Sequence, residues 1–119
     1  MEDEMLHMTM LFDFFGDLLT EKQSEYFDLY HNEDLSLSEI AESAGISRQG
    51  VYDIISRAEK SLAEMEQKTG VAQRWLGMQA GLRQAEAIAH ELLRLSDGKK
   101  ESANLAHNLI LTLEGLNGI

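Results

Sequence analysis

Apolar residues recur along this chain at spacings of three and four, with polar residues between them. This spacing places apolar side chains on one face of an α-helix. Proline is absent, and Leu, Ala, Glu and other residues that favour helices are abundant. Together with the turn signals, the pattern predicts helices at about 4–19, 21–31, 37–43, 48–68, 71–95 and 101–116. The predicted fold class is therefore all-α.

Several predicted helices begin and end at residues that favour those positions. Thr20 with Gln23, and Ser36 with Glu39, have the spacing of a capping box, in which two side chains satisfy free backbone N–H groups at a helix start. Gly45 follows the short third helix and is expected to adopt a left-handed conformation there. These signals predict two well-defined helix starts and one tight turn.

The helices on either side of Gly45 meet the requirements of a helix-turn-helix. Ala41 is small where the two helices would cross, and Gly45 permits a sharp turn between them. Apolar residues are available for a shared core, which is expected to contain Leu37, Ile40, Ala44, Ile46, Val51 and Ile54. Because these requirements are met together, the sequence favours a helix-turn-helix over two ordinary helices joined by a glycine turn.

The outward face of the second of these helices is the candidate binding surface. Its N-cap is Ser47, and the face is expected to carry Ser47, Arg48, Gln49, Tyr52, Asp53, Ser56 and Arg57. Arg and Gln side chains can read purine edges, and a helix N-terminus can hold a phosphate. Acidic residues nearby, Asp53 and Glu59, oppose the basic ones, so the local charge is small. The alternative is that this face binds a protein partner or is simply solvated.

The first part of the chain also resembles known proteins. The stretches LSEIAE at 37–42 and GISRQGVYD at 45–53 resemble region 4 of bacterial sigma factors. With LFDFF at 11–15 and LTEKQ at 19–23, the chain more closely resembles the YlxM family of small bacterial helix-turn-helix proteins, over about residues 8–72. The resemblance implies a regulatory or accessory role in the signal recognition particle pathway, and a homodimer. The implied partners are DNA or RNA, components of that particle, and a second copy of the chain.

The distribution of charge opposes nucleic-acid binding. The net charge is −11, and residues 1–70 hold five Lys or Arg against sixteen Asp or Glu, whereas residues 71–119 hold five of each. A protein that binds phosphates normally presents a basic surface. Two functions therefore remain open: a regulatory protein that binds nucleic acid, and a helix-turn-helix scaffold that binds protein without binding DNA.

The C-terminal part has a pattern of its own. Apolar residues alternate by four and three in a heptad-like seam, which consists of Val71, Trp75, Met78, Leu82, Ala85, Ala89 and Leu92. This seam can pack against the last helix or against another subunit, and a mixture of the two is expected. The predicted domains are residues 1–69, a helix-turn-helix with a leading helix, and residues 70–119, a helical segment for dimerisation.

Nothing in the sequence predicts an enzyme, a cofactor or a metal site. The histidines, at positions 7, 31, 90 and 107, share no ligand spacing, and the carboxylates are better explained as a solvated acidic face. Cysteine is absent, which excludes disulfides and thiolate sites. The acidic N-terminus does not resemble a signal peptide, and no apolar run is long enough to cross a bilayer. We therefore expect a cytoplasmic protein without membrane insertion.

Overall fold

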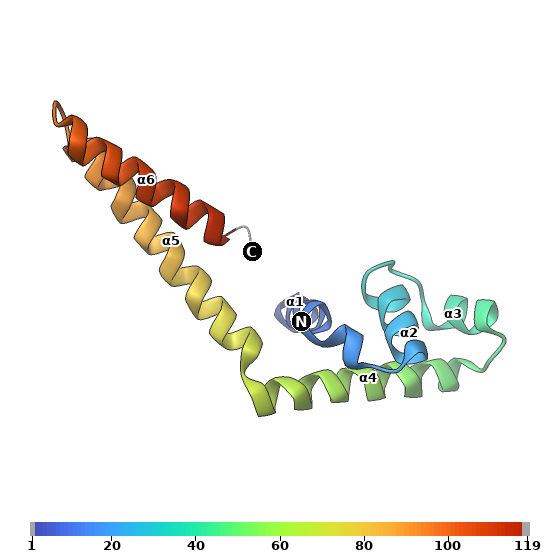
Figure 1. Cartoon of the computed structure of the whole chain (residues 1–119). Coiled ribbons are helices and arrows are strands. Elements are labelled where there is room, and N and C mark those ends of the chain that lie inside the picture. Colours follow the sequence, from blue (N-terminus) through green and yellow to red (C-terminus); the bar gives the residue numbers. More distant parts are fainter. Residues whose placement is uncertain (1, 118–119) are drawn as a thin grey trace. The chain divides into compact units, whose positions relative to one another are not determined.

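The computed structural model describes residues 2–117 and the side chains of residues 7–116, and the regular elements in this part are all helical (Figure 1). They are α1 (Glu2–Phe15), the 3-10 helix η1 (Gly16–Leu18), α2 (Glu21–His31), α3 (Leu37–Ala44), α4 (Arg48–Thr69), α5 (Val71–Leu95) and α6 (Lys100–Asn117). The prediction of an all-α fold is confirmed. The chain forms two compact units, Met1–Ala72 and Gln73–Ile119, which are described separately below.

The helix predicted at 4–19 ends earlier than expected. Its α-helical part stops at Phe15, a single 3-10 turn follows, and Leu19 is extended with φ −78° and ψ 161°. Thr20, the N-cap of α2, is extended as well, with φ −65° and ψ 158°. The N-cap of α2 has the non-helical backbone that such a position needs, and with Leu19 also extended the chain leaves the helix one residue before Thr20. The prediction of one continuous helix to residue 19 was therefore wrong.

Both predicted capping boxes are confirmed. The Thr20 hydroxyl accepts a hydrogen bond from the Gln23 N–H at 3.2 Å, and the Gln23 side chain accepts one from the Thr20 N–H at 3.1 Å. Ser36 and Glu39 form the same pair of bonds, at 3.0 Å and 3.1 Å. Gly45 has the predicted left-handed conformation, with φ 72°. The starts of α2 and α3 and the turn after α3 are thus fixed by local hydrogen bonds and by one glycine.

We expect Ser36→Ala to lower the free energy of unfolding by about 1 kcal/mol at neutral pH, the usual cost of losing an N-cap. Hydrogen bonds from the backbone and side chain of Ser36 lower the pKa of Glu39. That carboxylate therefore stabilises α3 above its unfolded pKa of about 4.3, and the contribution is lost as the pH falls through the lowered pKa. Urea denaturation measures both effects. The control is Ser38→Ala, an exposed position of α3 outside the box, and an equal loss in this control would contradict the expectation.

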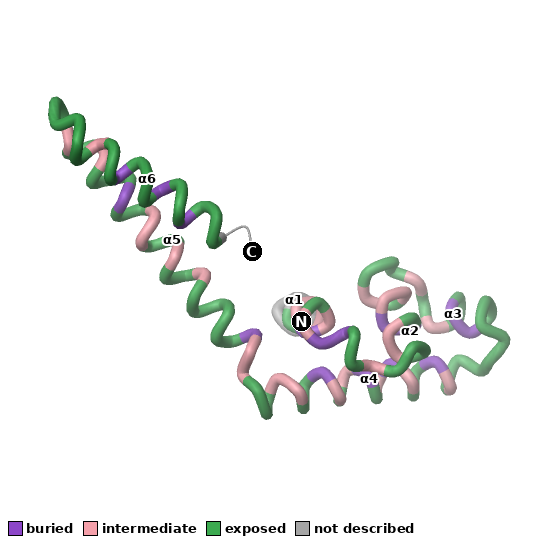
Figure 2. Tube along the Cα trace, viewed as in Figure 1, coloured by how far each residue is buried: buried purple, intermediate pink, exposed green. Residues whose placement is uncertain are grey.

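The first unit is organised around α4. Four residues of α4, spaced by four, three and four, are at most 3% exposed, namely Val51, Ile55, Ala58 and Leu62 (Figure 2). One cluster joins α4 to α1, α2 and the start of α5, and its buried members are Leu11, Phe15, Phe27, Ala58, Leu62 and Ala72. A second cluster joins α4 to α2 and α3, and its buried members are Tyr26, Ile40, Ala41, Val51 and Ile55. A single long helix thus carries both halves of the core.

The predicted helix-turn-helix core needs two corrections. Ala44 is exposed and Ile46 is 38% exposed, so neither belongs to the core. Both residues flank Gly45 at the turn, where the cluster formed by α2, α3 and α4 does not extend. Ile54 does pack against this core while partly buried, and Ile55, which the sequence did not single out, is buried in it four residues after Val51.

The second unit is a helical hairpin. A short turn at residues 96–99, with Gly98 at φ 74°, joins α5 to α6, which runs back along it (Figure 1). The two helices pack through Ala89 of α5 and Ile110 and Leu113 of α6. The predicted seam is only partly used, because Met78 and Leu92 of α5 remain 62% and 50% exposed. No helix within the described residues has the length and apolar character that crossing a membrane requires.

Candidate nucleic-acid interface

The turn at Gly45 leads directly into the N-terminus of α4. Ser47 is the N-cap, and its hydroxyl oxygen accepts a hydrogen bond from the Gly50 N–H at 3.0 Å. The hydroxyl of Ser47 can still donate its own proton outward. The first N–H groups of a helix have no partner within it, so this end of α4 offers donors and a partial positive charge to an anion.

The predicted interface residues lie together along α4, on the face opposite the buried stripe. Arg48, Gln49, Asp53 and Arg57 are exposed, and Tyr52 is 52% exposed. Ser56 is half-buried at the edge of this face, and Ser47 is exposed at its start. We call the set of Ser47, Arg48, Gln49, Tyr52, Asp53, Ser56 and Arg57 the outer face of α4.

Two of these side chains bind each other. The Gln49 amide donates a hydrogen bond to the Asp53 carboxylate at 3.0 Å, an i,i+4 pair on the helix surface. This bond occupies one of the two N–H groups with which Gln49 could contact a base edge. By contrast, neither Arg48 nor Arg57 forms an ion pair with any described side chain, so both guanidinium groups are available to a ligand.

The second acidic residue near this face is directed elsewhere. Glu59 is half-buried, and one of its carboxylate oxygens lies 3.2 Å from the Nε2 atom of His31 in α2. Only 6% of the His31 side chain is exposed, and its ring stacks on that of Phe27 at 4.2 Å between centroids. Glu59 therefore contributes to the packing of α4 on α2, and Asp53 is the carboxylate that remains within the outer face of α4.

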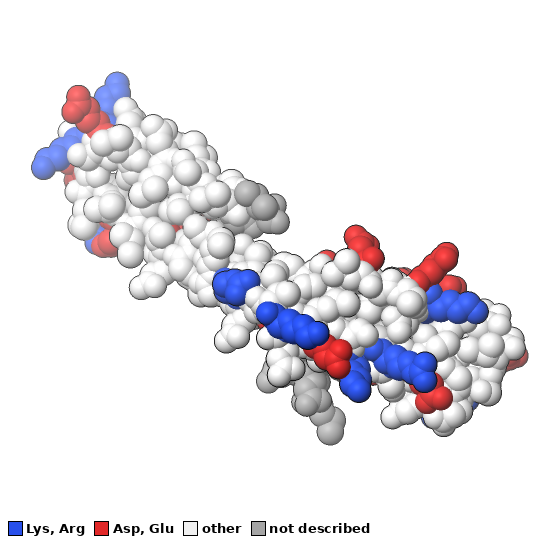
Figure 3. All heavy atoms as spheres, turned by 60° about the horizontal axis from the view of Figure 1, so that its bottom comes forward, with Lys and Arg blue, Asp and Glu red and all other residues white. Residues whose placement is uncertain are grey.

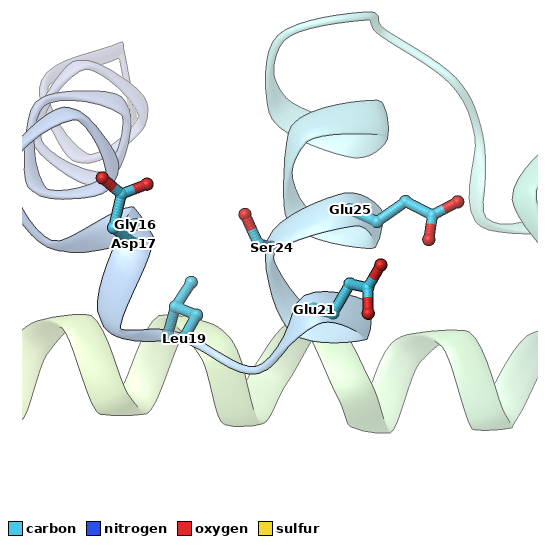
Figure 4. Close-up of a pocket in the computed structure, with 6 residues that line it drawn as sticks. All are labelled: Gly16, Asp17, Leu19, Glu21, Ser24 and Glu25. Atoms are coloured by element: carbon cyan, nitrogen blue, oxygen red, sulfur yellow. The ribbon is translucent and has the colours of Figure 1, made fainter.

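Three further carboxylates of the first unit lie on another surface. Residues of η1 and α2 line a hollow of about 530 Å³, namely Gly16, Asp17, Leu19, Glu21, Ser24 and Glu25 (Figure 4). Its three carboxylates do not point toward α4 (Figure 4). Where α4 is in view, basic and acidic side chains are interspersed, without a continuous basic surface (Figure 3). These three carboxylates thus point away from α4.

The predicted set of interface residues leaves out one basic residue of the same stretch that lies beside this face. Lys60 is exposed and lies three residues after Arg57, so it extends the same side of α4 by about one turn. Its spacing from Arg57 was the signal available in the sequence. The sequence did not predict that the intervening Ala58 is buried or that Glu59 contacts His31 of α2.

Comparison with known proteins identifies close relatives. The family UPF0122, described as "Putative helix-turn-helix protein, YlxM / p13 like", matches residues 2–104. The UPF0122 protein of Thermoanaerobacter pseudethanolicus is 54% identical over 74 residues, which are 62% of this chain and 63% of that protein. The UPF0122 protein of Halalkalibacterium halodurans is 54% identical over 68 residues, which are 57% of this chain and 62% of that protein. The aligned region thus spans a little under two thirds of each relative.

Proposed function

Because the chain belongs to the UPF0122 family of YlxM/p13-like helix-turn-helix proteins, we propose that it is a regulatory or accessory protein that binds nucleic acid through the outer face of α4. The observation that carries this proposal is that the guanidinium groups of Arg48 and Arg57 are accessible. Both are exposed, and both lack an ion pair among the described side chains. A phosphate or a base edge can therefore bind them without displacing a carboxylate from either guanidinium.

The charge map is compatible with this function despite the net charge of −11. Long-range repulsion from the acidic surface of η1 and α2 is screened over about 8 Å at physiological ionic strength. The contacts on α4 are local, and the negative hollow around Glu21 and Glu25 does not point toward that helix. Binding should accordingly be modest in affinity, and it should depend on the few basic residues of α4.

A second candidate function is supported by the side chains of the same face. The Gln49 amide, which could otherwise contact a base, is hydrogen-bonded to Asp53, and the neighbouring Tyr52 exposes its aromatic ring. Exposed tyrosines are common at protein–protein interfaces. In this alternative the helix-turn-helix serves as a docking surface for a protein and does not bind nucleic acid.

The proposal extends to the signal recognition particle pathway. Its support is the resemblance of residues 8–72 to the YlxM family, including the stretches at 11–15 and 45–53. In this form of the proposal the nucleic acid is the RNA of the particle, and the protein partner in the alternative is its GTPase. Helices read double-stranded RNA poorly, because its major groove is narrow, so an RNA target would offer single-stranded or distorted segments.

A second copy of the chain is the other proposed partner, through the α5–α6 hairpin. Large apolar side chains that remain at least 44% exposed on these two helices include Leu76, Met78, Ile88, Leu92, Leu95, Leu105, Leu109, Leu111 and Leu116. Burying such surface stabilises an assembly by about 25 cal/mol per Å². Light scattering should give twice the mass of one chain, and a single-chain mass at all concentrations would contradict this part of the proposal.

A fluorescence anisotropy titration tests the proposed function. The purified protein is titrated into labelled random duplex DNA, into the particle's RNA and into its labelled GTPase, each at low and at moderate salt. Binding to DNA or RNA that weakens with salt is the expected result. Binding to the GTPase alone would support the docking alternative, and binding to none of the three would overturn both candidate functions.

A further inference from the structure

The hairpin of the second unit is held by a small apolar contact. Ala89, Ile110 and Leu113 are buried between α5 and α6, with Leu82, Ala85 and Leu93 packed against them. These few side chains join helices of 25 and 18 residues. Small helical units with so little core usually need an additional link, such as oligomerisation, a disulfide or a metal ion. The chain has no cysteine, so a disulfide is excluded here.

The same packing brings together side chains that can bind a metal. Glu86 and His90 lie one turn apart on α5, next to the buried Ala89, and Glu114 follows the buried Leu113 on α6. One ligand atom from each of Glu86, His90 and Glu114 lies within 4.8 Å of the other two. The His90 Nε2 atom is 3.8 Å from a carboxylate oxygen of Glu86. The core of the hairpin thus sets the register that holds an imidazole nitrogen beside two carboxylates.

We propose that Glu86, His90 and Glu114 form a binding site for a divalent transition-metal ion of the Zn²⁺ type. Zinc takes imidazole nitrogen and carboxylate oxygen at about 2.0–2.2 Å, and three protein ligands with one water complete a tetrahedral site. Donor atoms in such a site are roughly 3.4 Å apart. The three side chains would therefore approach one another by up to about 1.4 Å, through side-chain rotation.

The composition of the site selects the type of metal. An imidazole ligand suits Zn²⁺, Co²⁺ and similar ions, whereas Mg²⁺ and Ca²⁺ prefer oxygen ligands only. The two glutamates carry like charges that the hairpin holds close together, and a bound cation offsets their repulsion. The Glu114 carboxylate pairs with no Lys or Arg among the described side chains, so it can turn toward the ion without losing a salt bridge.

The metal would join α5 to α6, because its ligands come from both helices. Binding energy at such a site adds to the stability of the hairpin, since the unfolded chain does not hold the three ligands together. Sequence reasoning missed the site for a definite reason. The histidines share no common spacing, and Glu114 lies far along the chain from His90. Only the turn at residues 96–99 and the packing of the hairpin bring these residues together.

Calorimetric titration of the untagged, metal-free full-length protein with Zn²⁺ tests this site. The expected result is saturable binding of one ion per chain, no competition by Mg²⁺, and visible absorption bands of tetrahedral coordination when Co²⁺ replaces Zn²⁺. His90→Ala and Glu114→Gln should each weaken Zn²⁺ binding by about tenfold or more, because loss of an outer hydrogen-bond partner alone costs about 10- to 100-fold. Thermal unfolding should shift upward with Zn²⁺ in the wild type and not in His90→Ala.

Matched controls keep the test specific to this site. His107→Ala removes an exposed histidine of α6, and Glu101→Gln removes an exposed glutamate near its start. Both controls should bind Zn²⁺ like the wild type. Circular dichroism checks that every variant keeps its helices. The proposal is overturned if the wild type shows no saturable binding, or if His90→Ala binds Zn²⁺ as tightly as the wild type.

Discussion

Replacing Phe27 by alanine should lower the free energy of unfolding of the first unit by about 3–5 kcal/mol. Phe27 is fully buried, and its ring stacks on Phe12 at 4.6 Å and on His31 at 4.2 Å between centroids. It belongs to the cluster that joins α1 and α2 to α4. Its removal would leave a cavity among three helices and withdraw support from the ring of His31. Single domains are stable by only about 5–15 kcal/mol, so the variant should be largely unfolded in mild denaturant.

Urea denaturation followed by far-ultraviolet circular dichroism measures this loss. The control is Leu18→Ala, because Leu18 is a large apolar residue of the same unit that is 69% exposed. A surface substitution of that kind should change the stability by no more than about 0.5 kcal/mol. Equal midpoints for Phe27→Ala and the wild type would show that Phe27 does not hold α1 and α2 on α4.

The double variant Arg48→Ala and Arg57→Ala should bind nucleic acid at least about 30-fold more weakly than the wild type at low salt, the loss that corresponds to about 1 kcal/mol for each arginine. Each guanidinium that contacts a phosphate or a base contributes about 1–3 kcal/mol, and both are available on the outer face of α4. Adding Gln49→Ala should weaken binding further only if the amide leaves Asp53 to contact a base. Anisotropy titrations against the same duplex DNA and RNA measure these losses.

The control for this prediction is Arg83→Ala, which removes an exposed arginine from α5 in the second unit. It changes the net charge by one but leaves α4 unaltered. Binding that falls as far in Arg83→Ala as in the α4 variants would indicate a general effect of charge. Unchanged binding in the double variant would exclude the outer face of α4 as the nucleic-acid interface.

Local signals in the sequence predicted most of the helices. The starts of α2 and α3 depend on pairs of residues three apart, such as Thr20 with Gln23, and these bonds form within one helical turn. The turn after α3 depends on a single left-handed glycine, Gly45. The end of α1 was missed because the 3-10 turn at Gly16–Leu18 and the extended Leu19 leave the apolar spacing unbroken. An apolar spacing alone does not show where a helix must stop for the next one to begin.

The features that the sequence did not reveal depend on contacts between helices. Ala44 and Ile46 have apolar side chains near the turn, yet neither belongs to the cluster that α2, α3 and α4 form, because burial depends on the neighbouring helices. The bond between Glu59 and His31 joins α4 to α2 across 28 positions. Glu59 is therefore directed toward α2, whereas in the sequence it is expected to oppose the basic residues of the outer face of α4. The assignment of the seven residues of the outer face of α4 stays a prediction, as does the division into domains at residue 69.

The measurement that tests the central claim most directly is the salt dependence of the affinity of the wild-type protein for duplex DNA. In a plot of log K against log salt concentration, each phosphate neutralised contributes about −0.9 to the slope. If Arg48, Arg57 and Lys60 supply the contacts, we predict a slope of about −2.7, which is reduced to about −0.9 in the Arg48→Ala and Arg57→Ala double variant because only Lys60 then remains. A slope near zero in the wild type would contradict the claim that α4 binds nucleic acid.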